Sequence, residues 1–117
     1  AQRLTRVLCP ECKQPQQPDP SELALMGIDP AVLNGNTVYQ SVGCRSCIET
    51  GYKGRSGIFE IMEMTPALKS LVLKTSDANE IKAQAVADGM ITLRQDGVRQ
   101  LLEGQTSISE VVRVTQR

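Results

Sequence analysis

The sequence predicts an α+β fold, mainly helical, in which a small tetracysteine subdomain precedes a short β-strand segment and a bundle of short helices. All four cysteines fall in two C-x-x-C pairs, Cys9–Cys12 and Cys44–Cys47. A β-prone apolar run, IFEIMEM, follows at 58–64. From Thr65 onward the chain carries repeated helix-capping signals, each followed by apolar residues at helical spacing. These three observations set the predicted order of the parts.

The two C-x-x-C pairs favour a structural metal site. Each pair holds two thiolates close together, and two such pairs supply the four sulfur ligands of a tetrahedral Zn²⁺ site. The sequence has no histidine, and four thiolates close the coordination shell, which leaves no open position for catalysis. We therefore predict a structural zinc ion bound by Cys9, Cys12, Cys44 and Cys47.

Two alternative interpretations use the same four cysteines. A rubredoxin-like iron site accepts the same ligands, because thiolates alone do not distinguish zinc from iron. One Phe, two Tyr and no Trp would shield a redox centre poorly, which argues against iron. Two disulfides are the other interpretation, but the sequence shows no secretory signal, and disulfides are rare outside oxidising compartments.

The composition limits the class of partner. A length of 117 residues and a hydrophobic fraction of 40% indicate one small domain, or a piece of a larger one, with a modest core. Thirteen basic residues balance thirteen acidic ones and aromatic residues are scarce, which argues against nucleic acid. No apolar run is long enough to span a membrane. The start at Ala1 suggests an excised fragment, and a cytosolic location is the default expectation.

The first segment, 1–8, is expected to be the end of a helix that continues from upstream sequence. Leu4, Val7 and Leu8 have the i, i+3, i+4 spacing of one helical face. We then expect the tetracysteine subdomain to cover 9–48. Within it the sequence predicts short helices at 21–26 and 29–33, closed by Gly27 and by the 34–36 turn, and a strand at 37–42.

The segment 49–64 is predicted to be a glycine-rich turn followed by a strand at 58–64. This strand has two partly apolar faces, but the chain offers few other strands, so we expect it to complete a sheet from absent sequence. Within the turn Gly51–Gly57, two interpretations of Arg55 stay open. It contacts a phosphate or a neighbouring subunit, or it is a solvated side chain on a tight turn.

The segment 65–117 is predicted to be a helical subdomain. Thr65, the pair Ser76-Asp77, Thr92 and Ser107 are predicted N-caps, and the last two begin capping boxes of the S/T-x-x-E/Q type. Helices this short are unstable alone, so we expect them to pack as one bundle. The sequence contains no histidine and no G-x-x-x-x-G-K-[ST] phosphate loop, so no catalytic site is expected in this chain.

Several motifs occur in the order found in one known family. They are C-P-x-C-K at 9–13, G-C-x-x-C at 43–47, T-G-Y-K-G-R-S-G-I-F-E at 50–60, G-M at 89–90, T-L-x-x-D-G at 92–97 and E-V-V-R-V-T at 110–115. Over essentially its whole length the chain resembles the C-terminal part of the ATPases of the type II secretion system, the GspE family. Pilus-assembly ATPases of the PilB and MSHA type share most of these motifs and are the alternative. A free-standing zinc-ribbon adaptor is a further alternative.

The resemblance implies a fragment of a hexameric, RecA-like motor at the cytoplasmic face of the bacterial inner membrane, where it works with inner-membrane secretion proteins. In this family the four matching cysteines bind zinc. ATP and Mg²⁺ belong to upstream parts of the motor, and residues 1–8 would end a helix of its core. The fragment itself is expected to be inactive. Arg55 matches the arginine of a G-R-[ST]-G turn near the nucleotide, and Ser56 is a threonine in many relatives.

Overall fold

The computed structural model describes residues 1–25, 27–28, 30–33 and 36–115. The described chain forms six helices and two two-stranded antiparallel sheets, so the predicted α+β class is confirmed, although a mainly helical one is not. Predicted features at Met26, Asp29, Asn34, Gly35 and Arg117 lie outside the described residues. The elements are β1 (Gln2–Leu8), β2 (Gln14–Gln16), α1 (Pro20–Leu25), α2 (Pro30–Leu33), β3 (Val38–Gln40), β4 (Tyr52–Phe59), α3 (Pro66–Lys74), α4 (Ala78–Ala87), α5 (Leu93–Leu102) and α6 (Ile108–Thr115).

The N-terminal segment is a strand, so the predicted helix at 1–8 is wrong. β1 pairs antiparallel with β4, with Arg3 opposite Ile58 and Thr5 opposite Ser56. Leu4, which the helical interpretation placed on the buried face, is 49% exposed, whereas Thr5 is fully buried. The helical spacing of three apolar residues was therefore misleading, because pairing with a distant strand overrides a short local pattern.

The second strand of this ribbon begins earlier than predicted. β4 covers Tyr52–Phe59 and contains most of the glycine-rich segment, while 60–64 lies outside the strand. Gly54 adopts a φ of 90°, a conformation that glycine tolerates and other residues rarely adopt. The expectation that the chain itself offers this strand few partners is wrong for one edge, because β1 pairs with it. Completion of a larger sheet by absent sequence stays a prediction.

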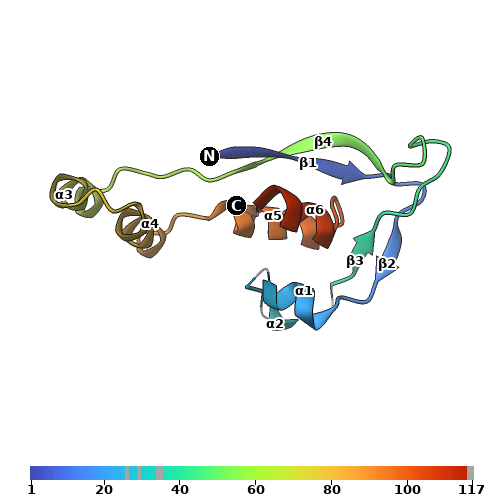
Figure 1. Cartoon of the computed structure of the whole chain (residues 1–117), viewed down its shortest axis with the longest axis horizontal. Helices are drawn as coiled ribbons and strands as arrows, with labels where there is room; N and C mark the ends of the chain where they lie inside the picture. Colours follow the sequence, from blue (N-terminus) through green and yellow to red (C-terminus); the bar gives the residue numbers. More distant parts are fainter. Residues whose placement is uncertain (26, 29, 34–35, 116–117) are drawn as a thin grey trace.

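Helices α5 and α6 cover one face of the β1–β4 ribbon (Figure 1). Ile58 on the ribbon, Leu101 on α5 and Val111 on α6 are almost completely buried. Gly97 lets α5 approach α6 closely, since a Cβ there would lie 3.0 Å from a methyl of Val111. The same core extends to the arm formed by α1, α2 and β3, and its buried members are Leu23, Leu33, Val38, Val98, Leu101, Ile108 and Val111.

A buried polar network fixes the ribbon against α5. The Thr5 hydroxyl donates to the Gln100 side-chain oxygen at 2.7 Å. The amide nitrogen of Gln100 donates in turn to the Ser56 hydroxyl and to the Gly57 carbonyl, each at 3.0 Å. A buried amide without partners is costly, so this network favours a single register of the ribbon on the helix.

Three of the predicted N-caps are confirmed in full. Thr65, Asp77 and Thr92 each accept a hydrogen bond from a backbone N–H in the first turn of α3, α4 and α5, and Thr92 with Gln95 forms the predicted capping box. The box predicted at Ser107 forms only in half. Its hydroxyl accepts from the Glu110 N–H at 3.2 Å, but the Glu110 carboxylate binds elsewhere.

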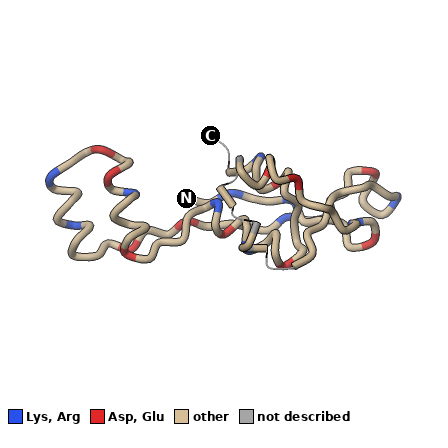
Figure 2. The backbone as a smooth tube through the Cα atoms, turned by 90° about the horizontal axis from the view of Figure 1, so that it is seen from below, with Lys and Arg blue, Asp and Glu red and all other residues tan. Residues whose placement is uncertain are grey.

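The helices after Thr65 do not form one bundle, which corrects that prediction. α3 and α4 pack against each other at the opposite end of the molecule from the cysteines, joined to the rest by 60–65 and 88–92 (Figure 1). Figure 2 shows the same separation from a second direction, with charges of both signs spread along the chain. The result is an elongated molecule of 55 × 27 × 20 Å. The α3–α4 pair buries only Leu68 and Ala85 fully.

Glu110 joins α6 to β1. Its carboxylate is fully buried and accepts from the Arg6 Nε at 2.6 Å and from the Arg113 Nε at 2.5 Å. Burial tends to raise the pKa of Glu110, but the hydrogen bonds from Arg113 and Arg6 outweigh it and hold this pKa below its usual range. At pH values above the ordinary glutamate pKa of about 4.3, the ionised carboxylate therefore stabilises the folded state. This stabilisation is lost as the pH falls through the lowered pKa of the folded state.

We predict that Glu110→Gln lowers the free energy of opening of α6 by about 2 kcal/mol at pH 7, because hydrogen bonds to a charged group contribute about 1.5–3 kcal/mol. Native-state amide hydrogen exchange of α6 measures this change, and the difference from the wild type should shrink at pH 3. Glu103→Gln, which removes the exposed pair with Arg99, is the matched control. Equal effects of the two substitutions would contradict the assigned role of Glu110.

Candidate metal centre

The four cysteine sulfur atoms meet at one end of the molecule. Cys9 and Cys12 lie on the turn that follows β1, and Cys44 and Cys47 lie on the turn that precedes β4. The four Sγ atoms lie within 4.8 Å of one another, with Cys9 and Cys47 buried and the other two half-buried. The structure therefore brings together all four predicted ligands from two distant parts of the chain.

The spacing of the sulfur atoms matches a tetrahedral site. The Sγ–Sγ distances are 3.8 Å for Cys9–Cys44, 3.8 Å for Cys12–Cys47 and 3.7 Å for Cys44–Cys47. Four sulfurs at about 2.3 Å from a central zinc ion lie about 3.8 Å apart. All four cysteines are free thiols here, with no disulfide among them. The donor set and its spacing thus fit a single thiophilic ion such as Zn²⁺.

Backbone N–H groups surround the sulfur atoms. Gly43 donates to the Cys12 Sγ at 3.4 Å, while Cys44 and Gly51 donate to the Cys47 Sγ at 3.2 Å each. Burial tends to raise the pKa of Cys47, but the hydrogen bonds from the backbone of Cys44 and Gly51 outweigh it and lower this pKa to about 6. These donors favour the thiolate, the form that binds a metal.

The second cysteine turn has an unusual backbone. Ile48 and Glu49 have φ angles of 56° and 62°, in the left-handed region that β-branched residues in particular avoid. This conformation directs the Glu49 N–H to the Cys44 carbonyl at 2.8 Å and closes the turn around the sulfurs. Gly43 completes it, because a Cβ there would lie 3.0 Å from the Glu49 carbonyl oxygen. No local sequence pattern predicted this backbone conformation.

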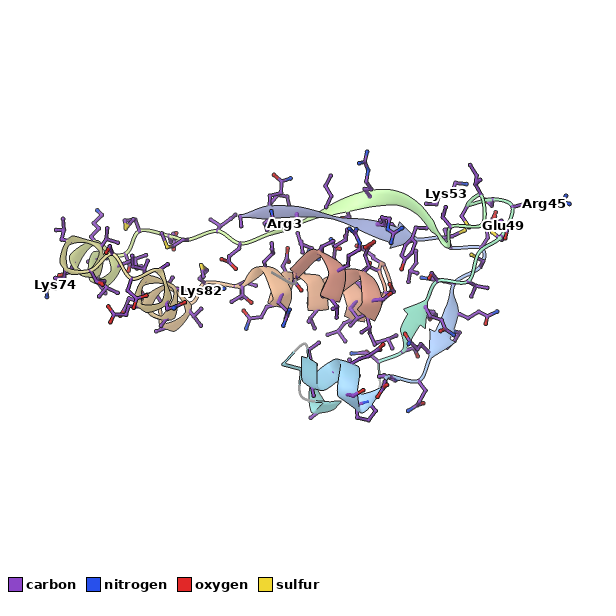
Figure 3. The ribbon with its side chains drawn as sticks, viewed as in Figure 1. Arg3, Arg45, Glu49, Lys53, Lys74 and Lys82 are labelled. Atoms are coloured by element: carbon purple, nitrogen blue, oxygen red, sulfur yellow. The ribbon has the colours of Figure 1, made fainter. Side chains whose placement is uncertain are left out.

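The basic residues nearest in sequence do not gather around the sulfurs. Lys13 donates to the Gly104 carbonyl at 2.9 Å and lies 4.5 Å from the centre of the Tyr39 ring. Lys53 donates to the Ser46 hydroxyl at 3.1 Å. Arg45 extends outward at this end of the molecule, away from the rest of the chain (Figure 3). Among the described residues, the N–H groups that donate to the sulfur atoms therefore belong to the backbone and not to these basic side chains.

Arg55 lies on β4 and is exposed, outside the sulfur cluster. Its Cα pairs across the ribbon with that of Arg6, so two like charges stand opposite each other. The Arg6 guanidinium is bound by the Glu110 carboxylate, and its central carbon lies 4.2 Å from the centre of the Tyr52 ring. Among the residues that the structure describes, no acidic side chain forms an ion pair with Arg55.

The fold and the cysteine cluster define a class of protein: an elongated α+β module with four clustered cysteines at one end. The family model described as "Type II/IV secretion system protein" matches residues 1–113, and the chain belongs to this family.

Among curated relatives, the chain is 44% identical over 115 residues to "Type II secretion system protein E" of Pseudomonas aeruginosa, covering 98% of this chain and 22% of the relative. It is 42% identical over 113 residues to "Type IV pilus assembly ATPase PilB" of Myxococcus xanthus, covering 96% of this chain and 20% of the relative. The "Type II secretion system protein E" of Pectobacterium carotovorum subsp. carotovorum is 41% identical, with coverage of 98% and 22%. The chain thus spans about a fifth of the length of these relatives. Within its described part, no helix has the length and apolar character needed to cross a membrane.

We predict that Cys44→Ser prevents stoichiometric metal binding and removes amide protection throughout 9–51, while α3 and α4 stay folded. Loss of a structural zinc site removes on the order of 10 kcal/mol of coupled folding energy. Elemental analysis and amide hydrogen exchange measure the two effects. Ser46→Ala changes a residue between two ligands without removing a sulfur, and it should retain the metal. Unchanged protection in Cys44→Ser would contradict a structural metal.

Proposed function

We propose that this chain is the zinc-stabilised C-terminal part of a motor ATPase that powers protein export by the type II secretion system. The observation that carries the proposal is the tetrahedral spacing of Cys9, Cys12, Cys44 and Cys47 in a chain of this family. The relatives named above include type II secretion proteins and pilus-assembly ATPases, and the chain corresponds to about a fifth of their length. The chemistry of the motor then belongs mainly to the remaining four fifths.

Zinc has a structural role in this proposal. It would be held by four thiolates and would supply charge and fixed geometry rather than an open position for catalysis. The cysteine residues fix the turn after β1 against the turn before β4 and so orient both strands of the ribbon. The backbone donors from Gly43, Cys44 and Gly51 stabilise the thiolates and orient them.

The exposed apolar side chains support a position within a larger protein. Most of them lie between β4 and α5, on the strand end, the two connecting segments and the α3–α4 pair. Large apolar side chains that are exposed together in one part of a chain are typical of a surface that contacts another protein segment. We propose that the rest of the motor covers this region, which comprises Phe59, Ile61, Met62, Met64, Val72, Leu73, Val86 and Ile91.

The proposal extends to the assembly. The full-length protein would bind ATP and Mg²⁺ through upstream residues, form a homohexamer and work at the cytoplasmic face of the inner membrane with secretion proteins there. The isolated chain would be inactive, because its sequence has no phosphate-binding loop. The four proposed segments remain residues 1–8, 9–48, 49–64 and 65–117, with the first now a strand.

Arg55 is proposed to contact a phosphate of the nucleotide or an acidic group of a neighbouring subunit. Its exposure and its lack of an ion pair among the described residues leave the guanidinium available to an anion. Arg6, directly opposite, is already held by Glu110. An arginine that reaches a nucleotide in this way stabilises the charge that develops during phosphoryl transfer.

Type IV pilus assembly is the second candidate function. It is favoured by the identity of 42% to the Myxococcus pilus-assembly ATPase, which differs little from the 44% to the Pseudomonas secretion protein. Complementation of strains that lack one or the other motor distinguishes the candidates. Restored export of secreted enzymes, without restored pili, would support the first.

We predict one zinc ion per chain and no iron. Elemental analysis of the purified protein measures the metal, and far-ultraviolet circular dichroism before and after a chelator measures its contribution to folding. Zinc near one equivalent with structure lost on chelation is the expected outcome, because a structural metal site contributes to the folding free energy of the segments that supply its ligands. A red protein containing iron would overturn the zinc assignment and leave the family membership untouched.

We predict that Arg55→Ala lowers ATP turnover of the full-length motor about tenfold or more, since arginines that contact the transferred phosphate contribute at least that much. The metal content should not change. Arg3→Ala, an exposed arginine on the other strand of the same ribbon, is the matched control and should keep near-normal turnover. Turnover that is unaffected by Arg55→Ala would return this residue to the interpretation as a solvated turn residue.

A further inference from the structure

The turn between α5 and α6, Glu103–Ser107, is held from several directions by the cysteine end of the molecule. The Leu8 N–H donates to the Gln105 carbonyl at 2.8 Å, and the Thr106 hydroxyl donates to the Arg6 carbonyl at 2.9 Å. The Lys13 ammonium donates to the Gly104 carbonyl at 2.9 Å, and the hydroxyls of Tyr52 and Ser107 share a hydrogen bond of 2.7 Å. Four consecutive residues of one turn thus bind four different residues outside the C-terminal helices.

The residues that hold the turn are neighbours of the proposed metal ligands. Leu8 directly precedes Cys9, and Lys13 directly follows Cys12. Tyr52 follows Gly51, whose N–H donates to the Cys47 Sγ and whose carbonyl accepts from the Cys9 N–H at 3.0 Å. Beyond the pairing of β1 with β4, the positions of Leu8, Lys13 and Tyr52 therefore depend on how the two cysteine turns are fixed relative to one another.

Lys13 is the central member of this arrangement. Its ammonium lies between the Tyr39 ring and the Gly104 carbonyl, at the C-terminal end of α5, where a positive charge is favourable. Gly104 has a φ of 75°, and a Cβ there would lie 3.2 Å from the Tyr39 ring. Tyr39 belongs to β3, which leads to the second cysteine turn. Lys13 therefore links the two cysteine turns to the C-terminal end of α5, at the point where Gly104 approaches the Tyr39 ring closely.

We propose that the α5–α6 turn couples the metal state of the cysteine site to the packing of α5 and α6 on the ribbon, with Lys13 as the positioning residue. With the metal bound, the two cysteine turns hold Leu8, Lys13 and Tyr52 in fixed relative positions, and the turn finds all its partners. Without the metal the two turns separate and the α5–α6 turn loses its donors. This inference rests on the proposed metal site, and it adds a route from that site to the ribbon that carries Arg55.

The test uses the full-length protein and amide hydrogen exchange measured by mass spectrometry. Removal of zinc with a chelator should speed the exchange of the peptide covering 103–108 about tenfold or more, because local opening follows the loss of hydrogen-bond partners. The exchange of α3 and α4 should not change, since these helices lie at the far end of the molecule (Figure 1).

Two variants separate the role of Lys13 from a general loss of stability. Lys13→Met keeps the length and the contact with Tyr39 but removes the donor, so it should retain one zinc per chain and still show fast exchange at 103–108. Lys13→Arg restores a donor and should recover much of the protection. Lys53→Met is the matched control, because it removes a lysine beside the other cysteine turn that donates only to Ser46.

The outcomes separate this inference from the proposed function. If the protein binds zinc but removal of zinc leaves the exchange of 103–108 unchanged, the coupling is overturned and the proposed metal site stands. Equal exchange in Lys13→Met and Lys53→Met would overturn the positioning role of Lys13. A wild-type protein that binds no metal would overturn both the coupling and the proposed zinc site.

Discussion

The structure depends on one geometric constraint: four sulfur atoms from two distant turns lie within 4.8 Å of one another. Three of the distances between them are 3.7–3.8 Å, which is the spacing of sulfur ligands at about 2.3 Å from one tetrahedral ion. To reach them, the chain places Ile48 and Glu49 in the left-handed region and needs glycine at Gly43. Because β1 leads into one turn and β4 leaves the other, the same constraint also brings together the ends of the ribbon.

The ribbon is then fixed to the helices by polar rather than purely apolar contacts. The buried carboxylate of Glu110 binds Arg6 of the ribbon and Arg113 of its own helix, and Gln100 bridges Thr5 and Ser56. Such groups are costly to bury unless every partner is present. Apolar packing of α5 and α6 supplies most of the stabilising free energy, whereas these polar contacts select the orientation in which the helices lie.

In a motor of this family, such an arrangement would give the ribbon a clear role. It runs from the cysteine site toward the connecting segment that leads to α3, and Arg55 lies exposed along it. The large apolar surface between 59 and 91 lies at the other end. A ribbon with the cysteine cluster at one end and an exposed apolar surface at the other is suited to transmit a change of position between them.

The sequence by itself determined the features that depend on residue type and short spacing. The two C-x-x-C pairs identified the candidate ligands, and the local N-caps at Thr65, Asp77 and Thr92 began helices where predicted. Only the tertiary structure decided that residues 1–8 form a strand and that the helices after Thr65 separate into two pairs, α3 with α4 and α5 with α6. It also decided that Glu110 binds Arg6 rather than closing its capping box. These outcomes depend on partners far away in sequence, and no local pattern encodes the free energy of such contacts.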